Sequence, residues 1–182
     1  MPSLALATWD RHPLLYAEEA ALPALLAARG LDALPAVWSD PAVDWRSFDA
    51  VVLRSTWDYF ERLPKFLKWL EHLEALQVRL YNPLPLVRWN LDKHYLRDLE
   101  TRGAAIVPTV FVEPGGQADA AALMATRGWR EAVIKPAVSG GAFRTRRVTG
   151  EGPSAQEALA EVLQGGTALV QPFVPEIASV FA

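Results

Sequence analysis

The 182-residue chain has no cysteine, only three histidines and no long uncharged hydrophobic run. Without cysteine it can form no disulfide, thiolate zinc site or cysteine nucleophile, which fits a reducing compartment. Its most apolar later run, 20–28, is well short of the ~20 residues that a membrane-spanning helix needs. The N-terminal residues also lack a basic leader. We therefore expect a cytoplasmic protein that does not enter a membrane.

The charge balance argues against a nucleic-acid partner. The formal net charge is −3, so there is no basic surplus to follow a phosphate backbone. The histidines at positions 12, 72 and 94 do not have metal-ligand spacing. Because 51% of the residues are hydrophobic and 21% are charged, the chain should fold around a substantial core.

The first half of the chain alternates between strand and helix patterns. Strands are predicted over 3–8, 31–38, 49–53 and 78–81, and helices over 14–29 and 60–76. Pro23 must kink the first helix or mark a fresh start. The segment 82–85, Asn-Pro-Leu-Pro, interrupts the pattern. We therefore predict two domains, residues 1–82 and 83–182.

The second half begins with helices and continues with mixed elements. Helices are predicted over 85–89, 91–102, 120–126 and 154–163, and strands over 106–112, 132–135, 143–148 and 168–171. Pro108 cannot donate to a sheet ladder, which predicts that its strand lies at an edge. The sequence therefore predicts an α/β first domain followed by an α+β domain.

A strand, a glycine turn and a second strand stand out between Glu131 and Val148. Lys135 ends the first strand, and the turn contains Ser139-Gly140-Gly141. Glycine lets the backbone approach a ligand closely, so that N–H groups can converge on an anion. A serine nucleophile at Ser139 is disfavoured. A nucleophile elbow must turn from a strand into a helix, whereas the residues after this turn alternate like a strand. A lysine beside a glycine turn suggests a phosphate site.

Two further segments agree with a phosphate site. Asn90–Leu96 contains Lys93, and Leu169–Val174 reads LVQPFV. With the glycine turn they have the order and rough spacing of an ATP-grasp nucleotide site. The chain resembles the ATP-grasp superfamily, in its glutathione-synthetase-like group. The segment RSTWDY, 54–59, resembles a branch of uncharacterised or cycloserine-pathway relatives. The resemblance implies an N-terminal Rossmann-like, pre-ATP-grasp βαβ domain followed by the first part of an ATP-grasp α+β domain.

The resemblance also assigns roles to residues of the second domain. Lys93 and Lys135 would contact the α- and β-phosphates of ATP, and Ser139-Gly140-Gly141 would close on the triphosphate. The segment from Gln171 to Val174 would be a hinge whose backbone pairs with adenine, with Phe173 near the base. Apolar strand residues such as Val133 and Val170 would sandwich the purine.

In the first domain, the same resemblance implies a substrate site at the strand ends, where ligands gather in open α/β sheets. The residues singled out there are Asp10, Arg54, Ser55, Thr56 and Asp58. Arg54 is a candidate clamp for a substrate carboxylate. An ion pair between Arg54 and Asp58 or Asp10 is an equally weighted interpretation.

The family uses ATP and Mg²⁺ to make an acyl phosphate from a small carboxylate, which an amine then captures. Its magnesium ligands lie on strands beyond the hinge that this sequence does not contain, so the resemblance implies a form truncated before the magnesium-binding half. We predict an ATP-binding protein of the carboxylate–amine ligase type that is incomplete as a catalyst without that half. The alternative is a non-catalytic nucleotide-binding or interaction module that needs a partner chain. Val170, Phe173 and Phe181 should then be exposed and favour a homo-oligomer.

Overall fold

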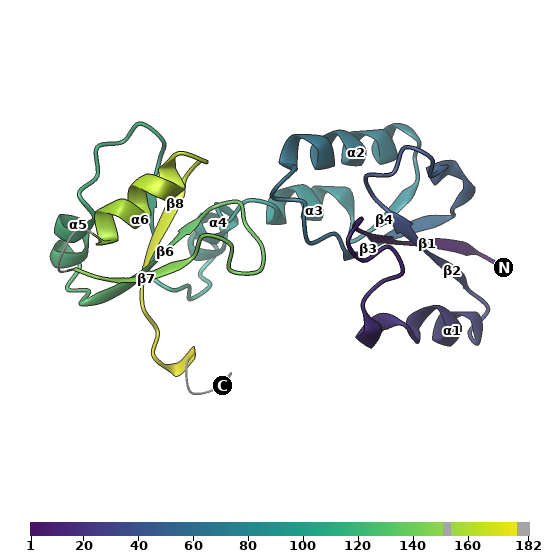
Figure 1. Ribbon diagram of the computed structural model, residues 1–182, viewed down its shortest axis with the longest axis horizontal. Helices are drawn as coiled ribbons and strands as arrows, with labels where there is room; N and C mark the ends of the chain where they lie inside the picture. The colour runs from purple at the N-terminus through teal and green to yellow at the C-terminus, as the bar shows by residue number, and fades with distance from the viewer. Residues whose placement is uncertain (151–153, 178–182) are drawn as a thin grey trace. The chain divides into compact units, whose positions relative to one another are not determined.

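The computed structural model describes residues 1–150 and 154–177, and the chain divides into two compact units, residues 1–90 and 91–182 (Figure 1). The structure divides the chain after Asn90, whereas the sequence predicted a boundary after Asn82. The helix over Leu84–Asn90 therefore belongs to the first unit. None of the helices in the described residues combines the length and hydrophobicity that a membrane crossing requires.

The first unit is a four-stranded parallel sheet in the order β2-β1-β3-β4. Its strands are β1 (Ser3–Thr8), β2 (Asp32–Val37), β3 (Ala50–Ser55) and β4 (Arg79–Tyr81). Its helices are the 3₁₀ turns η1 (Ala17–Glu19) and η2 (Trp45–Ser47), and the α-helices α1 (Leu22–Ala27), α2 (Leu63–Ala75) and α3 (Leu84–Asn90). Pro23 lies at the start of α1, so the fresh start is confirmed.

The helices α1 and α2 lie on opposite faces of this sheet (Figure 1). On the α1 side, Leu6 and Ala33 pack with Leu22 and Leu26. The other core is aromatic, with Trp38, Trp45, Phe66 and Trp69 in contact through ring pairs whose centroids are 5.1–6.0 Å apart. Both faces of this parallel sheet are covered, and the carboxyl ends of its strands all point to the same side of the unit. That side carries the predicted substrate residues.

The second unit is an antiparallel sheet in the order β5-β8-β6-β7. Its strands are β5 (Val110–Val112), β6 (Glu131–Pro136), β7 (Arg146–Thr149) and β8 (Ala168–Pro172). Its helices are α4 (Tyr95–Thr101), α5 (Ala120–Thr126) and α6 (Ser154–Leu163). The prediction that an α/β unit is followed by an α+β unit is confirmed. The strand β5 lies at the edge of the second sheet, as Pro108 indicated.

The two faces of this sheet have different characters, because successive strand residues point to opposite sides. One face packs against α5 and α6 through buried residues of one cluster, among them Ala132, Ile134, Val148, Leu159 and Val170. The register places another set on the opposite face, which we call the lysine face: Glu131, Val133, Lys135, Arg147, Leu169 and Gln171. The predicted nucleotide-site side chains Lys135 and Gln171 therefore lie on the lysine face.

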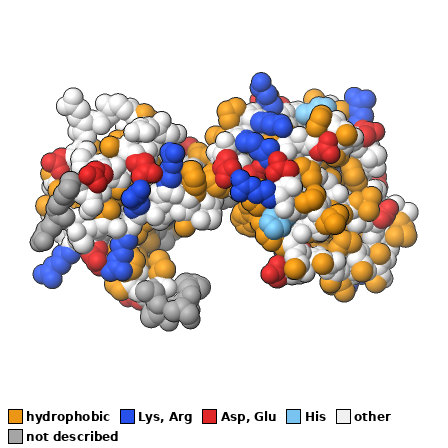
Figure 2. Space-filling model, in the orientation of Figure 1, with side chains coloured by type: hydrophobic (Ala, Val, Ile, Leu, Met, Phe, Trp, Pro, Cys, Tyr) orange, Lys and Arg blue, Asp and Glu red, His pale blue; other side chains and the backbone are white. Residues whose placement is uncertain are grey.

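Val170 was predicted to be exposed and to contact the purine, and this is wrong. It is 0% exposed within the helix-side core, because alternation places it opposite to Gln171. Phe173 is only half-buried, and Phe181 lies outside the described residues. Exposed large apolar side chains such as Leu14, Leu34 and Trp57 occur mainly on the first unit, as the orange atoms in Figure 2 show. Among the described residues, these side chains contribute to the exposed apolar surface and Val170 does not.

Candidate functional site

The connection from β6 to β7 is a tight double turn, and not the short turn and long strand predicted. The Phe143 N–H donates to the Gly140 carbonyl at 3.0 Å, and the Thr145 N–H donates to the Ala142 carbonyl at 3.0 Å. Gly141 and Ala142 have φ of +55° and +57°, so the first turn has both central residues left-handed. Residues 143–145 belong to these turns, so β7 begins at Arg146 and not at the predicted residue 143. Left-handed backbone at a residue with a Cβ is costly, and such strain is common in loops that close on ligands.

Lys93 holds the beginning of this loop in place. Its backbone N–H donates to the Ala137 carbonyl at 3.0 Å. Its Nζ lies 3.2 Å from the same oxygen, 2.9 Å from the Ser139 carbonyl oxygen and 2.9 Å from Ser139 Oγ. An ammonium has three donors, so these contacts use all of them. The structure therefore brings Lys93 and Ser139 together as predicted, and Lys93 is also a structural tie.

The two predicted phosphate-binding lysines share one electrostatic environment. Burial, and then the neighbouring charge of Lys135, lower the pKa of Lys93 from 10.5 to about 8. Burial also lowers the pKa of Lys135 below its usual value. Two half-buried ammonium groups close enough for one to lower the pKa of the other favour a nearby anion, because an opposite charge stabilises their charged forms. Lys93 contacts Ser139, and Gly140 and Gly141 come directly after Ser139 in the chain. Lys135 is near enough to lower the pKa of Lys93, so both lysines and the glycine turn lie in one region.

The lowered pKa of Lys93 predicts a dependence of stability on pH. Below about pH 8 the ammonium is charged in both the folded and the unfolded chain, so folding carries the full cost of burying it. Between about pH 8 and 10.5 the unfolded chain binds more protons at this position, so the free energy of unfolding rises with pH. Lys93→Met removes this rise, and urea denaturation of both proteins at pH 7.5, 8.5 and 9.5 measures the difference. A constant difference between the two proteins contradicts the prediction.

The predicted adenine hinge is partly committed to the sheet. The Phe173 N–H donates to the Glu131 carbonyl at 3.0 Å, so the Phe173 amide belongs to the ladder with β6. Backbone groups of an extended chain point alternately to the two sides. The Pro172 carbonyl and the Val174 N–H therefore face the β5 side, as an acceptor and a donor two residues apart. Gln171 is buried, and its Nε2 donates to Thr109 Oγ at 2.7 Å.

In the first unit, Arg54 and Ser55 meet at one carboxylate that the sequence did not indicate. Glu19, in η1, lies 2.8 Å from Arg54 Nη2 and accepts the Ser55 hydroxyl at 2.6 Å. Its side chain is 12% exposed, whereas that of Arg54 is 46% exposed. Glu19 thus fixes the position of the Arg54 guanidinium, which remains accessible to solvent, as a clamp for a substrate carboxylate requires.

The expected ion pair of Arg54 with Asp58 or Asp10 is wrong, because both carboxylates pair with Arg62. Arg62 Nη1 lies 3.1 Å from Asp10, and Nη2 pairs with the buried Asp58. Asp58 also accepts the Trp38 Nε1–H at 2.8 Å. Arg62 follows Asp58 by four residues. Opposite charges at this spacing often pair, so the sequence could have indicated the ion pair between Arg62 and Asp58. Thr56 is half-buried at the same sheet edge.

No group of three histidine, aspartate or glutamate side chains in the described part of the chain could hold a metal ion. Mg²⁺ requires several oxygen ligands, so these residues alone do not fit a protein-held magnesium site.

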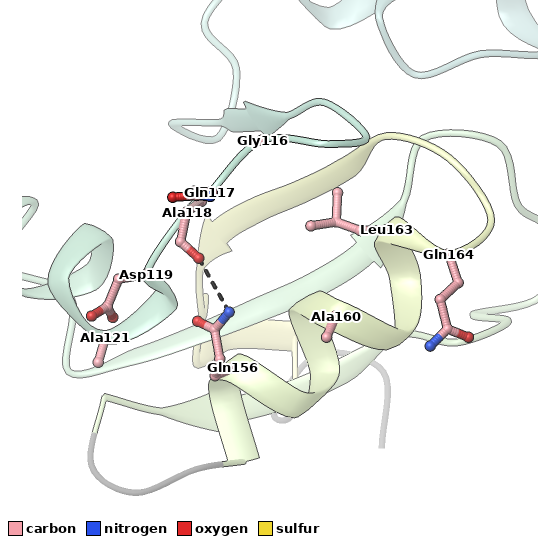
Figure 3. Close-up of a pocket in the computed structure, with 9 residues that line it drawn as sticks. All are labelled: Gly116, Gln117, Ala118, Asp119, Ala121, Gln156, Ala160, Leu163 and Gln164. Atoms are coloured by element: carbon pink, nitrogen blue, oxygen red, sulfur yellow. Dashed lines mark hydrogen bonds between the residues drawn. The ribbon is translucent and has the colours of Figure 1, made fainter.

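A groove of about 850 Å³ lies between α5 and α6 (Figure 3). Its lining comes from 116–119, Ala121 and α6, and includes none of the predicted site residues. The Gln156 amide bridges it, donating to the Ala118 carbonyl and accepting from the Ala120 N–H, as the side-chain view shows for the first bond. This groove is on the helix side of the sheet and is not the candidate site.

Known proteins resemble the chain in sequence and in fold. Residues 4–82 match the family described as the N-terminal domain of D-cycloserine synthetase DcsG. The cycloserine biosynthesis protein DcsG of Streptomyces lavendulae is 39% identical over 163 residues, which are 85% of this chain and 54% of that protein. The chain thus spans about half the length of this relative.

Solved structures agree with the sequence comparison. D-cycloserine synthetase DcsG superposes with a TM-score of 0.85 at 35% identity, covering 96% of this chain and 60% of that one. A RimK domain ATP-grasp protein from Sphaerobacter thermophilus gives 0.71 at 21% identity, over 95% and 64%. D-alanine–D-alanine ligase from Bacillus anthracis gives 0.63 at 12%, over 96% and 58%, which shows the fold alone. Over the part that it spans, the chain has the fold of these proteins, as its resemblance to the ATP-grasp superfamily predicted.

Proposed function

We propose that this chain supplies the ATP-binding lysines and the acceptor-binding unit of an ATP-dependent carboxylate–amine ligase. The observation that carries the proposal is the convergence of Lys93 and Lys135 beside the glycine turn. Burial lowers the pKa of both ammonium groups, and the charge of Lys135 lowers that of Lys93 further, so an anion beside them would be favourable and a polyphosphate supplies the matching charge.

The described residues divide the work of nucleotide binding. Lys135 is a flexible cation that can follow the phosphates, whereas Lys93 adds positive charge beside them and uses its donors to hold the loop at Ser139. The left-handed loop is the element that would close. The Pro172 carbonyl and the Val174 N–H match the donor and acceptor on the edge of adenine. The second unit thus orients ATP from base to γ-phosphate.

The first unit would hold the acceptor through Arg54, whose guanidinium is positioned by Glu19. The match of residues 4–82 to the D-cycloserine synthetase family supports a small, amino-acid-like substrate. In a ligase of this type the substrate carboxylate attacks the γ-phosphorus, ADP leaves, and an amine displaces phosphate from the acyl phosphate. Bound Mg²⁺ would supply further charge neutralisation, and the chain's residues contribute positioning and cationic stabilisation.

A second candidate is nucleotide binding without turnover, favoured by the lack of a metal-holding group among the described residues. Calorimetric titration with ATP and Mg²⁺, together with a phosphate-release assay over candidate amino acids, tests both candidates. We expect the chain alone to bind ATP and to release no phosphate. Phosphate release by the isolated chain would overturn the second candidate, and no heat of binding at millimolar ATP would overturn both.

A further inference from the structure

Three side chains from neighbouring strands form a cluster on the lysine face. Arg147, on β7, lies with its guanidinium carbon 3.7 Å from the centroid of the Phe173 ring. Its Nη2 lies 2.8 Å from each carboxylate oxygen of Glu131, on β6. The Glu131 carbonyl in turn accepts the Phe173 N–H. Glu131 therefore contacts both the Arg147 side chain and the Phe173 backbone.

The sheet register places this cluster on the path of a nucleotide. Val133 is directly opposite both Arg147 and Gln171, in one row across the sheet. Lys135 lies two residues further along β6, which is roughly 7 Å in a strand. A nucleotide with its phosphates at Lys135 and its base at the hinge therefore passes over Val133, beside Arg147.

We infer that Arg147 is the stacking surface for the nucleotide base. The inference rests on the proposed function and deepens it. One face of the Phe173 ring is already covered by the guanidinium, so on that side the base meets Arg147 and not the ring. A guanidinium is planar and weakly hydrated, so its second face can stack on a purine while its first stays on phenylalanine. The ion pair with Glu131 holds that plane in position.

The test separates the base from the phosphates by comparing ATP with inorganic tripolyphosphate. Stacking on a base is worth ~1–3 kcal/mol, so Arg147→Ala should weaken ATP binding about 5- to 150-fold. It should leave the affinity for tripolyphosphate within about twofold. Arg147→Lys keeps the charge and loses the plane, so it should behave like Arg147→Ala towards ATP.

The adjacent Arg146 offers a matched control. It is a similarly exposed arginine of β7, but it points to the helix face, where it pairs with Glu161 at 2.7 Å. Arg146→Ala should leave both affinities unchanged. Equal losses for ATP and tripolyphosphate in Arg147→Ala, or full ATP affinity in Arg147→Lys, would show a charge effect and overturn the inference.

The result also distinguishes this inference from the proposed function. If ATP binding depends on Lys135 but is unchanged in Arg147→Ala, only the stacking role is wrong. If neither substitution affects ATP binding, or the unmodified chain does not bind ATP, the nucleotide site itself is wrong. Thermal unfolding of each variant confirms that the fold is intact, which is expected because Arg147 is exposed.

Discussion

Replacing Lys135 by methionine is expected to weaken ATP binding about 10- to 150-fold. A hydrogen bond to a charged group is worth ~1.5–3 kcal/mol, and the proposed site gives the half-buried ammonium of Lys135 such a bond to phosphate. Methionine keeps the length and apolar stem of the side chain, so the packing against the sheet is largely conserved. The double replacement with Lys93→Met is expected to abolish measurable binding, because both cations of the proposed site are then gone.

Calorimetric titration of ATP, with tripolyphosphate as a second ligand, provides the measurement. Both ligands should lose affinity together, because Lys135 recognises phosphate and not the base. Lys68→Met is the control, since Lys68 is an exposed lysine of the first unit and the change in net charge is identical. An equal loss of affinity in the control would reduce the effect to general electrostatics. Unchanged affinity in Lys135→Met would remove the basis of the proposed site.

Lys93 is the less direct probe of phosphate binding, because it has two roles. Its ammonium binds the Ala137 and Ser139 carbonyls in addition to lying beside Lys135. Its replacement therefore loosens the loop and removes a cation at once. Lys135 separates these effects, which is why the single Lys135 variant is the primary test.

Strong local signals predicted much of the fold. The helices 120–126 and 154–163 agree with α5 and α6 at both ends, and the Asp119 side chain caps α5 by accepting the Ala122 N–H. The helix predicted from Phe60 begins only at Leu63, because turns from Thr56 and Asp58 precede it. The strand predicted over 106–112 shortens to Val110–Val112. Pro108 has no N–H, and the Thr109 hydroxyl bonds locally to the Val107 carbonyl.

Side-chain partners that depend on tertiary structure could not be predicted in the same way. The proximity of Lys93 to Lys135 and the glycine turn was predicted from the resemblance to ATP-grasp proteins and not from local spacing, because Lys93 precedes α4 and Lys135 lies near the end of β6. The pairing of Arg54 with Glu19 joins residues 35 positions apart on different elements, and no local spacing indicates it. Val170 was placed on the wrong face because a short apolar strand buried on both sides, like ALVQP, shows no alternation.

Replacing Asp58 by alanine is expected to destabilise the first unit by about 3–5 kcal/mol, the range found when one partner of a buried ion pair is removed. Asp58 is 2% exposed, accepts the Trp38 indole N–H and pairs with Arg62. Its loss leaves the buried Trp38 indole N–H without an acceptor and leaves Arg62 with only the exposed Asp10 as its carboxylate partner. Asp58 was singled out as a substrate residue, but both of its carboxylate oxygens are already engaged within the fold.

Urea denaturation followed by tryptophan fluorescence measures the effect, because Trp38 lies next to the changed residue. Asp10→Ala is the matched control. It removes the other carboxylate bound to Arg62, but its side chain is 56% exposed, so a loss of at most about 1 kcal/mol is expected. Asp58→Asn should fall between the two, because the amide oxygen still accepts the indole N–H while the ion pair is lost. If Asp58→Ala is as stable as Asp10→Ala, Asp58 does not hold this edge of the sheet together, and a substrate-binding role becomes the better explanation for a buried carboxylate there.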